Sequence, residues 1–358
     1  MTPHTWTYAE IVELLEPPPG PSSPGVVVGT SGSTGSPKRA RLSVGALTAS
    51  ARSTLEVLGG PGQWLLATPA THIAGIQVLV RSALAGIEPV VMEAGGFTAE
   101  RFAEATGRLT HERTYVSLVP TQVQRLLDEP LGRAALARFT TVLVGGAAVP
   151  ATLRASAAAT GVDIVATYGM SETAGGCVYD GRPLPVARMR IADPGDDGVG
   201  VVELGGETLA DGYEGNEELT AQAFRTDPDG ARWFRTDDLG RIEDGVLSVL
   251  GRRDDVINTG GLKVSPHVVE EAVARALPEL AACSVVLATD DAQWGEAVTL
   301  VVAGRAAPSL ADVRDALRPL LIPAALPTRV AEVDEIPRLG PGKPDRRTLR
   351  AILSQPSG

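Results

Sequence analysis

Lysine is rare in this chain, and each of its lysines lies in a segment whose residue types could do chemistry. Of the 32 Lys and Arg residues, only Lys38, Lys263 and Lys343 are lysines, and all three follow glycines closely. An ammonium group on a flexible stem is a compact point charge that fits next to phosphate oxygens. We therefore expect these lysines to act on an anionic ligand. The alternative is a coding bias toward Arg that left three lysines by chance.

The segment from Gly29 to Lys38 is built from small residues and hydroxyls. Glycine lets backbone N–H groups turn toward an anion, and Ser and Thr add hydroxyl donors. It is not a Walker A loop, because Pro37 precedes Lys38 and Arg39 stands where a Ser or Thr would bind Mg²⁺. A strand before the segment and a helix after it argue against a merely flexible surface loop. The residues expected to contact phosphate are Thr30, Ser31, Gly32, Ser33, Thr34, Gly35 and Lys38.

A second segment, 167–173, places an aromatic ring, a hydroxyl and a carboxylate directly after an expected strand. Ligands bind at the carboxyl ends of strands in open α/β sheets. Tyr168 could stack on a base, and Glu172 could hold Mg²⁺ through oxygen. The alternatives are a core position for Tyr168 and a helix cap for Glu172.

A third segment carries Thr236, Asp237 and Asp238, and Arg252 and Asp254 follow it in the run 251–255. A carboxylate accepts hydrogen bonds from two ribose hydroxyls well, and a nearby Arg can bind a hydroxyl or a phosphate. The alternative is a pair of turn aspartates between hairpin strands.

The elements that must position these segments change in character along the chain. Short apolar runs alternating with helical spacing predict an α/β region of parallel or mixed sheets covered by helices on both faces. The expected strands are 26–28, 64–67, 89–92, 115–119, 141–144 and 162–165, and the expected helices are 7–16, 42–58, 121–127 and 151–158. From about residue 189, short strands and Gly/Asp turns predict a β-barrel-like section.

After residue 255 an α+β pattern begins, with helices expected at 266–277 and 310–321 and strands at 284–287 and 297–302. A length of 358 residues exceeds what one core usually supports. We expect a large N-terminal domain over 1–252, truncated at its N-terminus, and a small mobile C-terminal domain over 255–358, with a hinge at 253–255.

Composition excludes several classes of protein. A net charge of −11 argues against a nucleic-acid binder held by a basic surface. The most apolar stretch, 65–84, is interrupted by Pro69, His72, Gln77 and Arg81, so it does not predict a membrane span. No signal peptide is visible, and Cys177 and Cys283 lack metal-ligand spacing. These features predict a cytoplasmic protein with free thiols.

Together, the segments around Lys38, Tyr168, Asp238, Arg252 and Lys343 resemble, in order, the motifs of the adenylate-forming enzymes. This superfamily includes acyl-CoA synthetases, nonribosomal-peptide adenylation domains and luciferases. The resemblance covers residues 26–347 and implies an ATP-dependent, Mg²⁺-dependent ligase with two half-reactions. A carboxylate first attacks the α-phosphorus of ATP and releases pyrophosphate. A thiol, such as that of CoA, then displaces AMP.

The resemblance also implies roles for individual residues. Residues 30–38 would close over the β- and γ-phosphates, Tyr168 would stack on adenine, and Gly169 would also bind the nucleotide. Ser171 would reach the α-phosphate and Glu172 would coordinate Mg²⁺. Asp238 and Arg252 would bind ribose, although Asp237 stands where the family has glycine. Lys343 would bridge the attacking carboxylate and the α-phosphate, and Asp254 would be the hinge that brings Gly260, Gly261 and Lys263 to face CoA.

Within this superfamily the chain looks most like the o-succinylbenzoate–CoA ligases of menaquinone biosynthesis. Its N-terminal region is unusually short for the superfamily, since only 28 residues precede Gly29. The runs 69–75, 117–121 and 144–147 also resemble segments of these ligases. The acyl pocket implied by this resemblance contains His72, Ser117, Gly145 and Gly146, with His72 also a catalytic candidate. The alternative for His72 is a satisfied buried histidine. A second carboxylate on the acid would need a polar partner, for which Arg81, Arg113 and Arg188 are candidates.

Two other functions remain open at this point. An adenylating ligase could hand another acid to a carrier-protein thiol or an amine, in which case it would stall at the adenylate with free CoA. A nucleotide-binding pseudoenzyme is the non-enzymatic alternative, and the presence of Lys343, Glu172 and Asp238 argues against it. An edge left open by the short N-terminus could be covered by a second subunit, so a homodimer is expected.

Overall fold

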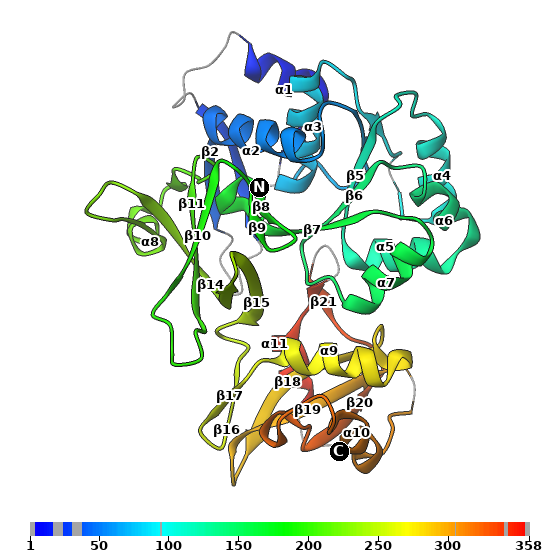
Figure 1. Cartoon of the computed structure of the whole chain (residues 1–358), viewed down its shortest axis with the longest axis vertical. Helices are drawn as coiled ribbons and strands as arrows, with labels where there is room; N and C mark the ends of the chain where they lie inside the picture. Colours follow the sequence, from blue (N-terminus) through cyan, green and yellow to red (C-terminus); the bar gives the residue numbers. More distant parts are fainter. Residues whose placement is uncertain are drawn as a thin grey trace.

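The computed structural model describes residues 4–16, 24–30, 38–93, 95–304, 306–339 and 343–354. Figure 1 shows a large part formed by residues up to about 252 and a smaller part formed by the rest of the chain. The fold is mixed α/β, as the sequence predicts.

The centre of the large part is a seven-stranded sheet that is parallel on one side and antiparallel on the other. Its strands are, in spatial order, β4 (Val90–Val91), β3 (Gln63–Leu66), β5 (Thr114–Leu118), β6 (Thr141–Val144), β7 (Ile164–Met170), β8 (Gly175–Tyr179) and β9 (Arg182–Pro183). The strands from β4 to β7 are parallel, so their carboxyl ends meet at one edge.

Helices cover both faces of this sheet. Successive residues of a strand point to opposite faces, so neighbouring residues pack against different helices. Val116 of β5 packs in one core with helices α4 to α7, whereas Tyr115 packs in another with α2 and α3. The helices are α2 (Val44–Val57), α3 (Ile73–Ala85), α4 (Ala99–Gly107), α5 (Pro120–Asp128), α6 (Pro130–Leu136) and α7 (Ala151–Ala159). This explains why the strand sequences are apolar throughout rather than alternating.

A small sheet of β1 (Pro24–Gly29), β2 (Arg39–Ser43) and β12 (Gly212–Tyr213) packs with α1 (Tyr8–Leu15), α2 and α3. The residues before and after 31–37 therefore form an antiparallel hairpin, in which Gly29 pairs with Arg39. The expectation of a helix directly after the loop, over 42–58, is wrong in its first residues. The strand continues to Ser43, whose hydroxyl accepts a hydrogen bond from Ala46 and starts α2.

The β-rich section is a five-stranded antiparallel sheet. Its strands are β10 (Ala187–Ala192), β11 (Gly200–Gly206), β13 (Phe224–Thr226), β14 (Arg232–Glu243) and β15 (Val246–Arg252), and the short helix α8 (Glu217–Ala223) follows β12. The long strand β14 pairs with β11, β13 and β15 along different parts of its length. Through this change of partners β14 joins β11, β13 and β15 in one sheet.

The smaller part consists of a second five-stranded sheet with helices. Its elements are β16 (Ile257–Thr259), β17 (Leu262–Val264), α9 (Pro266–Ala276), β18 (Ser284–Asp291), β19 (Gly295–Ala303), α10 (Leu310–Leu317), β20 (Arg329–Val333), β21 (Arg338–Leu339), β22 (Lys343–Pro344) and α11 (Arg346–Leu353). The helix α11 lies beyond the last element that the sequence predicts, the helix over 310–321. Its only fully buried residue among those described is Leu349.

Apolar cores of the described residues lie on one side or the other of 253–255, and none contains residues from both sides. In the part of the chain that the structure describes, no helix is both long and apolar enough to cross a bilayer. Both cysteines are free thiols, as expected, and Cys177 is buried.

Candidate functional site

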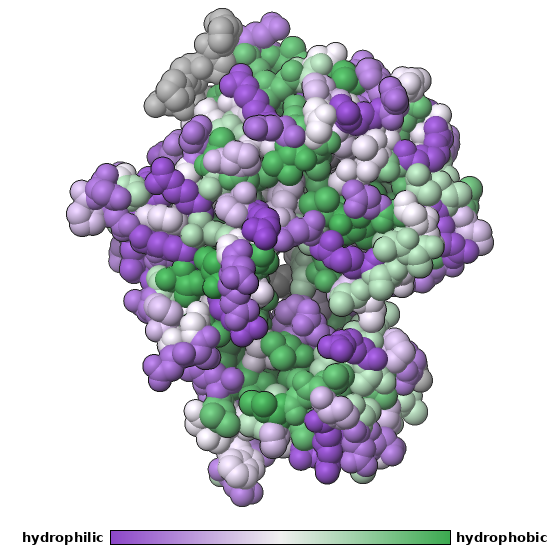
Figure 2. Space-filling view, in the orientation of Figure 1, coloured by the Kyte–Doolittle hydropathy of each residue, from purple (hydrophilic) through white to green (hydrophobic). Residues whose placement is uncertain are grey.

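A cavity of about 2210 Å³ lies between the two parts of the molecule. Figure 2 shows the surface hollowed at this place, with hydrophilic side chains along the rim. Most site residues expected from the sequence line it, namely Thr30, Lys38, His72, Ser117, Gly145, Gly146, Tyr168, Gly169, Ser171, Glu172, Asp238 and Arg252. The volume exceeds that of a typical small-ligand pocket and leaves room for more than one substrate.

The parallel sheet brings several of these residues to one edge. Ser117 lies near the end of β5, Gly145 and Gly146 follow β6 directly, and Tyr168 lies in the last half of β7. Because the three strands are parallel and adjacent, residues far apart in the sequence open into the same cavity.

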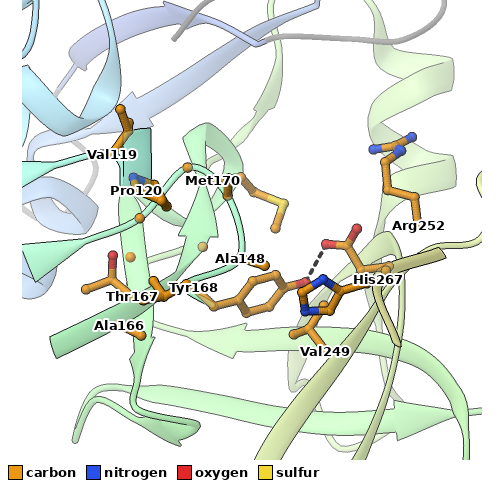
Figure 3. Close-up of a pocket in the computed structure, with 18 of the residues that line it drawn as sticks. Val119, Pro120, Ala148, Ala166, Thr167, Tyr168, Met170, Val249, Arg252 and His267 are labelled. Carbon is orange, nitrogen blue, oxygen red and sulfur yellow. Dashed lines mark hydrogen bonds between the residues drawn. The ribbon is translucent and has the colours of Figure 1, made fainter. Parts of the chain in front are cut away.

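Tyr168 crosses the cavity from β7 to β14. Its hydroxyl donates a hydrogen bond of 2.7 Å to Oδ2 of Asp238. Figure 3 shows the ring pointing toward Val249 and His267, with Arg252 beyond the carboxylate. Burial, reinforced by the Asp238 carboxylate, holds the pKa of the Tyr168 hydroxyl well above its usual range. The phenol therefore stays protonated and fixes the carboxylate by donating to it.

The backbone next to Tyr168 requires glycine. Gly169 has φ 155°, and a Cβ atom there would lie 2.2 Å from the backbone oxygen of Gly175. This close approach comes from the tight connection between β7 and β8 through the single-turn helix η1 (Ser171–Thr173). The connection turns Ser171 and Glu172 toward the cavity.

Asp237 and Asp238 lie in a bulge of β14 rather than in a hairpin turn. Val201 pairs with Leu239 and Glu203 with Arg235, so residues 236–238 face the single residue Val202. A bulge re-aims side chains and kinks a strand. The turn-aspartate alternative is therefore wrong, and the bulge directs Asp238 toward Tyr168.

Asp237, the residue that departs from the superfamily motif, forms an ion pair with Arg252. The distance from Arg252 Nη2 to Asp237 Oδ2 is 3.2 Å, and Arg252 Nε lies 2.7 Å from Asp254 Oδ1. Arg252 is thus held between two carboxylates, one in β14 and one at the expected hinge. These contacts tie the bulge to the segment that joins the two parts of the chain.

Of the segment expected to bind phosphate, 29–38, the structure describes the residues at its two ends, up to Thr30 and from Lys38 onward. The amide of Thr30 donates a hydrogen bond of 2.8 Å to the Lys38 carbonyl, which closes the hairpin under the loop. Ser171 donates to the Gly29 carbonyl at 3.4 Å. The predicted phosphate contacts Ser31, Gly32, Ser33, Thr34 and Gly35 lie outside the described residues.

Glu172 is a buried carboxylate with 6% of its surface exposed. Tyr213 donates a hydrogen bond of 2.8 Å to its Oε1. Burial raises the pKa of the Glu172 carboxyl, while the hydrogen bond from Tyr213 and the nearby charge of Lys38 oppose that rise. Neither the sequence nor the superfamily motif pointed to Tyr213, because its partner is 41 residues away.

A magnesium ion fits at Glu172 only if other groups supply most of its ligands. The described residues contain no cluster of three or more His, Cys, Asp or Glu side chains that could hold a metal. Mg²⁺ commonly takes one or two carboxylates and completes its shell with substrate phosphates and water. One buried carboxylate beside the phosphate loop matches that donor set.

The opposite end of the cavity contains His72, the residue directly before α3, and Arg81, which lies within α3. His72 precedes the helix and is exposed, so the alternative of a satisfied buried histidine is wrong. Arg81 is 3% exposed and lines the cavity. Arg113 and Arg188, the other two candidates for a second carboxylate, are exposed and do not line it.

Arg81 is a buried cation that pairs with no carboxylate of the described residues. Its Nη2 donates to the Tyr179 hydroxyl at 3.5 Å, its guanidinium stacks on Trp64 at 5.0 Å, and its Nε has no hydrogen-bond partner. Burial lowers the pKa of Arg81, and Tyr179 counteracts this only in part. An uncompensated buried charge is costly, so this end of the cavity favours an anion.

The smaller part contributes to the cavity through α9 and the β21–β22 hairpin. Pro344, directly after Lys343, lines the cavity, as do Arg338 and Arg346. The Lys343 backbone pairs with Leu339, and its side chain lies outside the described residues. Gly260, Gly261 and Lys263 lie at the exposed β16–β17 turn and do not line the cavity in this arrangement.

Comparison with known proteins identifies the family. The model of the AMP-binding enzymes matches residues 4–214, which is more than half of the chain. The chain belongs to this family. Members of the AMP-binding family with similar sequences include a probable 2-succinylbenzoate–CoA ligase from Mycobacterium tuberculosis, 43% identical over 90% of this chain and 83% of the relative.

Two further relatives agree with this assignment. A 2-succinylbenzoate–CoA ligase from Listeria innocua is 30% identical over 90% of this chain and 69% of its own length. The structure of o-succinylbenzoate CoA synthetase from Bacillus subtilis, in complex with ATP and a magnesium ion, covers 92% of this chain and 69% of its own with a TM-score of 0.77 and 26% identity. Each is an enzyme to which this AMP-binding chain is similar.

Proposed function

We propose that this protein is an ATP-dependent acid–CoA ligase that adenylates o-succinylbenzoate, releases pyrophosphate, and transfers the acyl group to CoA with release of AMP. The observation that supports this substrate is Arg81, a buried cation with no carboxylate partner among the described residues, which lines the same cavity as Glu172 and Tyr168. o-Succinylbenzoate has two carboxylates. One is activated, and Arg81 binds the other.

ATP lies along the side of the cavity formed by Tyr168, Asp238, Glu172 and Lys38. The Tyr168 ring packs against the base, while Asp238, fixed by the Tyr168 hydroxyl, accepts hydrogen bonds from ribose hydroxyls. Lys38 contacts the triphosphate as a point charge. Glu172 would hold a magnesium ion, which would supply positive charge that neutralises phosphate oxygens.

In the first half-reaction an oxygen of the substrate carboxylate forms a bond to the α-phosphorus while the bond to the pyrophosphate oxygen breaks. Negative charge grows on the α-phosphate. Lys343, at the base of a hairpin whose Pro344 lines the cavity, stabilises this charge. A preorganised charge of this kind contributes roughly 10²–10³ in rate.

In the second half-reaction the CoA sulfur attacks the acyl carbon, the bond to the AMP oxygen breaks, and the thiol proton leaves to solvent. Residues 255–358 rotate about 253–255 for this step, withdrawing Lys343 and bringing Gly260, Gly261 and Lys263 to the cavity. The separate apolar cores on the two sides of 253–255 support two bodies that move independently. Arg252 and Asp254 form an ion pair at the pivot.

The experiment that tests the proposal measures pyrophosphate release and CoA thioester formation with o-succinylbenzoate, benzoate and a fatty acid. We expect thioester only with the dicarboxylic acid and only when ATP, Mg²⁺ and CoA are all present. Thioester from a monocarboxylic acid but not from o-succinylbenzoate would displace the substrate. Adenylate that accumulates with free CoA would favour a carrier-protein thiol or an amine as acceptor.

A homodimer and a cytoplasmic location complete the proposal. Light scattering at several protein concentrations would measure the oligomeric state, and a mass of one chain at all of them would exclude the dimer.

A further inference from the structure

Tyr213 is a buried residue of the cavity to which the two half-reactions assign no role. Its hydroxyl donates a hydrogen bond of 2.8 Å to Glu172 Oε1, and both residues are less than a tenth exposed. A tyrosine hydroxyl donates a single hydrogen bond, so Tyr213 contacts one oxygen of the Glu172 carboxylate, Oε1, and not the other.

Tyr213 is held in place from three directions. Strand β12 pairs it with Ala40 of β2, next to the phosphate-loop hairpin. Its amide donates a hydrogen bond of 2.8 Å to the Thr220 hydroxyl, and its ring packs edge-on against Phe224 at 5.8 Å. Because both the backbone and the ring of Tyr213 are held, its hydroxyl lies at one defined position.

Tyr213 also contacts the other charged group at the phosphate end of the cavity. The Lys38 ammonium lies over its ring, 5.7 Å from the centroid. Lys38 and Glu172 are close enough for their charges to interact, yet no carboxylate of the described residues forms an ion pair with Lys38. The ring face attracts a cation, and the hydroxyl satisfies the carboxylate.

This arrangement has a consequence for ATP binding. If Lys38 paired directly with Glu172, each group would neutralise the other, and the pair would have to break before Mg²⁺ and triphosphate could bind. Tyr213 satisfies both groups separately with weaker contacts. Both charges therefore remain available to the ligand.

We propose that Tyr213 is a positioning residue for the metal–triphosphate end of the ATP site. Its hydroxyl holds one oxygen of Glu172 so that the carboxylate can bind Mg²⁺, and its ring keeps Lys38 from pairing with Glu172. The inference rests on the proposed ATP-dependent function and adds a residue to its site. Tyr213 acts through Glu172 and Lys38 and touches neither the acid nor the reacting phosphorus.

The test compares ATP binding by calorimetry with Mg²⁺ and with EDTA, in the absence of any acid. In the wild-type protein Mg²⁺ should tighten ATP binding. Tyr213→Phe keeps the ring for Lys38 and removes the hydroxyl, so it should lose about fivefold to tenfold of the Mg²⁺-dependent gain while binding in EDTA stays unchanged. Tyr213→Leu should weaken both.

Tyr115→Phe is the matched control, because the Tyr115 hydroxyl shares its one proton between two partly buried carbonyls, those of Leu58 at 2.9 Å and Gly60 at 3.0 Å, and lies outside the cavity. It should lower the melting temperature and leave both affinities unchanged. If Tyr213→Phe does not fold, Thr220→Val loosens the same phenol from outside the cavity and should show part of the same loss.

A folded Tyr213→Phe protein with the full Mg²⁺-dependent gain would overturn the inference, as would an equal loss with Tyr115→Phe. Because binding is measured without acid, these outcomes are independent of the ligase reaction. Absence of thioester from every acid with the wild-type enzyme would instead overturn the proposed function and leave the metal dependence of ATP binding standing.

Discussion

The hydroxyl of Tyr168 in β7 donates a hydrogen bond of 2.7 Å to Asp238 in β14, 70 residues later in the chain. The bond connects the central sheet to the antiparallel sheet that contains β14, across the cavity. The proposed base platform and the proposed ribose carboxylate are thus set relative to each other before ATP arrives. Preorganisation of this kind saves ordering cost when the ligand binds.

Asp238→Asn should raise the dissociation constant of ATP by roughly tenfold, because hydrogen bonds to a charged acceptor are worth more than those to an amide. The loss should be much smaller for 3′-deoxy-ATP, which offers one hydroxyl fewer. Calorimetric titration with both nucleotides measures this. Asp229→Asn, in an exposed turn, is the control. A variant that still prefers ATP over 3′-deoxy-ATP as strongly as the wild type does would contradict the ribose assignment.

Arg81→Met should separate stability from substrate recognition. The change removes a buried charge that has no carboxylate partner among the described residues, so the melting temperature should stay the same or rise. The value of kcat/KM for o-succinylbenzoate should fall by roughly 30-fold or more, since a buried ion pair with the substrate is lost. Thermal unfolding and steady-state kinetics measure the two effects.

Arg113→Met, at an exposed position outside the cavity, should change neither quantity. A fall in the melting temperature of several degrees with Arg81→Met, without any change in kcat/KM, would show that Arg81 is structural.

Lys343→Ala and Lys263→Ala should affect opposite half-reactions. Lys343→Ala should nearly abolish pyrophosphate release, by roughly 10²-fold or more, and spare thioester formation from a supplied acyl-adenylate. Lys263→Ala should spare adenylation and slow the transfer to CoA. Pyrophosphate exchange and single-turnover thioester assays separate the two steps. Equal effects of both variants on both steps would contradict the rotation about 253–255.

Gly169→Ala should destabilise the protein by roughly 2 kcal/mol or more, because its φ of 155° and the 2.2 Å approach to the Gly175 oxygen leave no room for a Cβ atom. Urea denaturation measures the free energy of unfolding. Gly107→Ala is the matched control, since nothing lies within 4 Å of its Cβ position and φ is not positive. That change, in the last position of α4, should be neutral or slightly stabilising.

The two thiols should react very differently with Ellman's reagent. Burial raises the pKa of the Cys177 thiol to about 12, so hardly any thiolate exists at pH 8 and the reagent has no access. Cys283 is half-buried and should react in the native protein. We expect one thiol per chain to react in buffer at pH 8 and two in guanidinium chloride. Two rapid reactions in buffer would contradict the buried position of Cys177.

The parallel core could be predicted from the sequence because its strands are buried on both faces and read as continuous apolar runs. The hairpin around the phosphate loop could not. Apolar residues at positions 40 and 42 alternate as in a strand, whereas those at positions 44, 47 and 51 have the spacing of a helix. The two patterns run into each other, so apolar spacing alone does not show where the strand ends and the helix begins. Ser43, a helix N-cap, was the signal that separates them.

The site residues were predictable where they lie in contiguous segments, as Tyr168 and Glu172 do. Their contacts were not. The sequence predicts Asp238 as a site residue but not its hydrogen bond with Tyr168, and it predicts neither Tyr213 nor Tyr179. The place of Arg81 likewise depends on the packing of α3 against β8, which periodicity does not contain. The sequence thus predicts candidate groups, and only the fold shows what they contact.

Helix α8 has no fully buried residue, so its burial alone would predict that substitutions in it are tolerated. Through Thr220, however, it holds the strand that ends at Tyr213. Given the role proposed for Tyr213, a substitution at Thr220, which does not line the cavity, is therefore expected to change how strongly ATP binding depends on Mg²⁺.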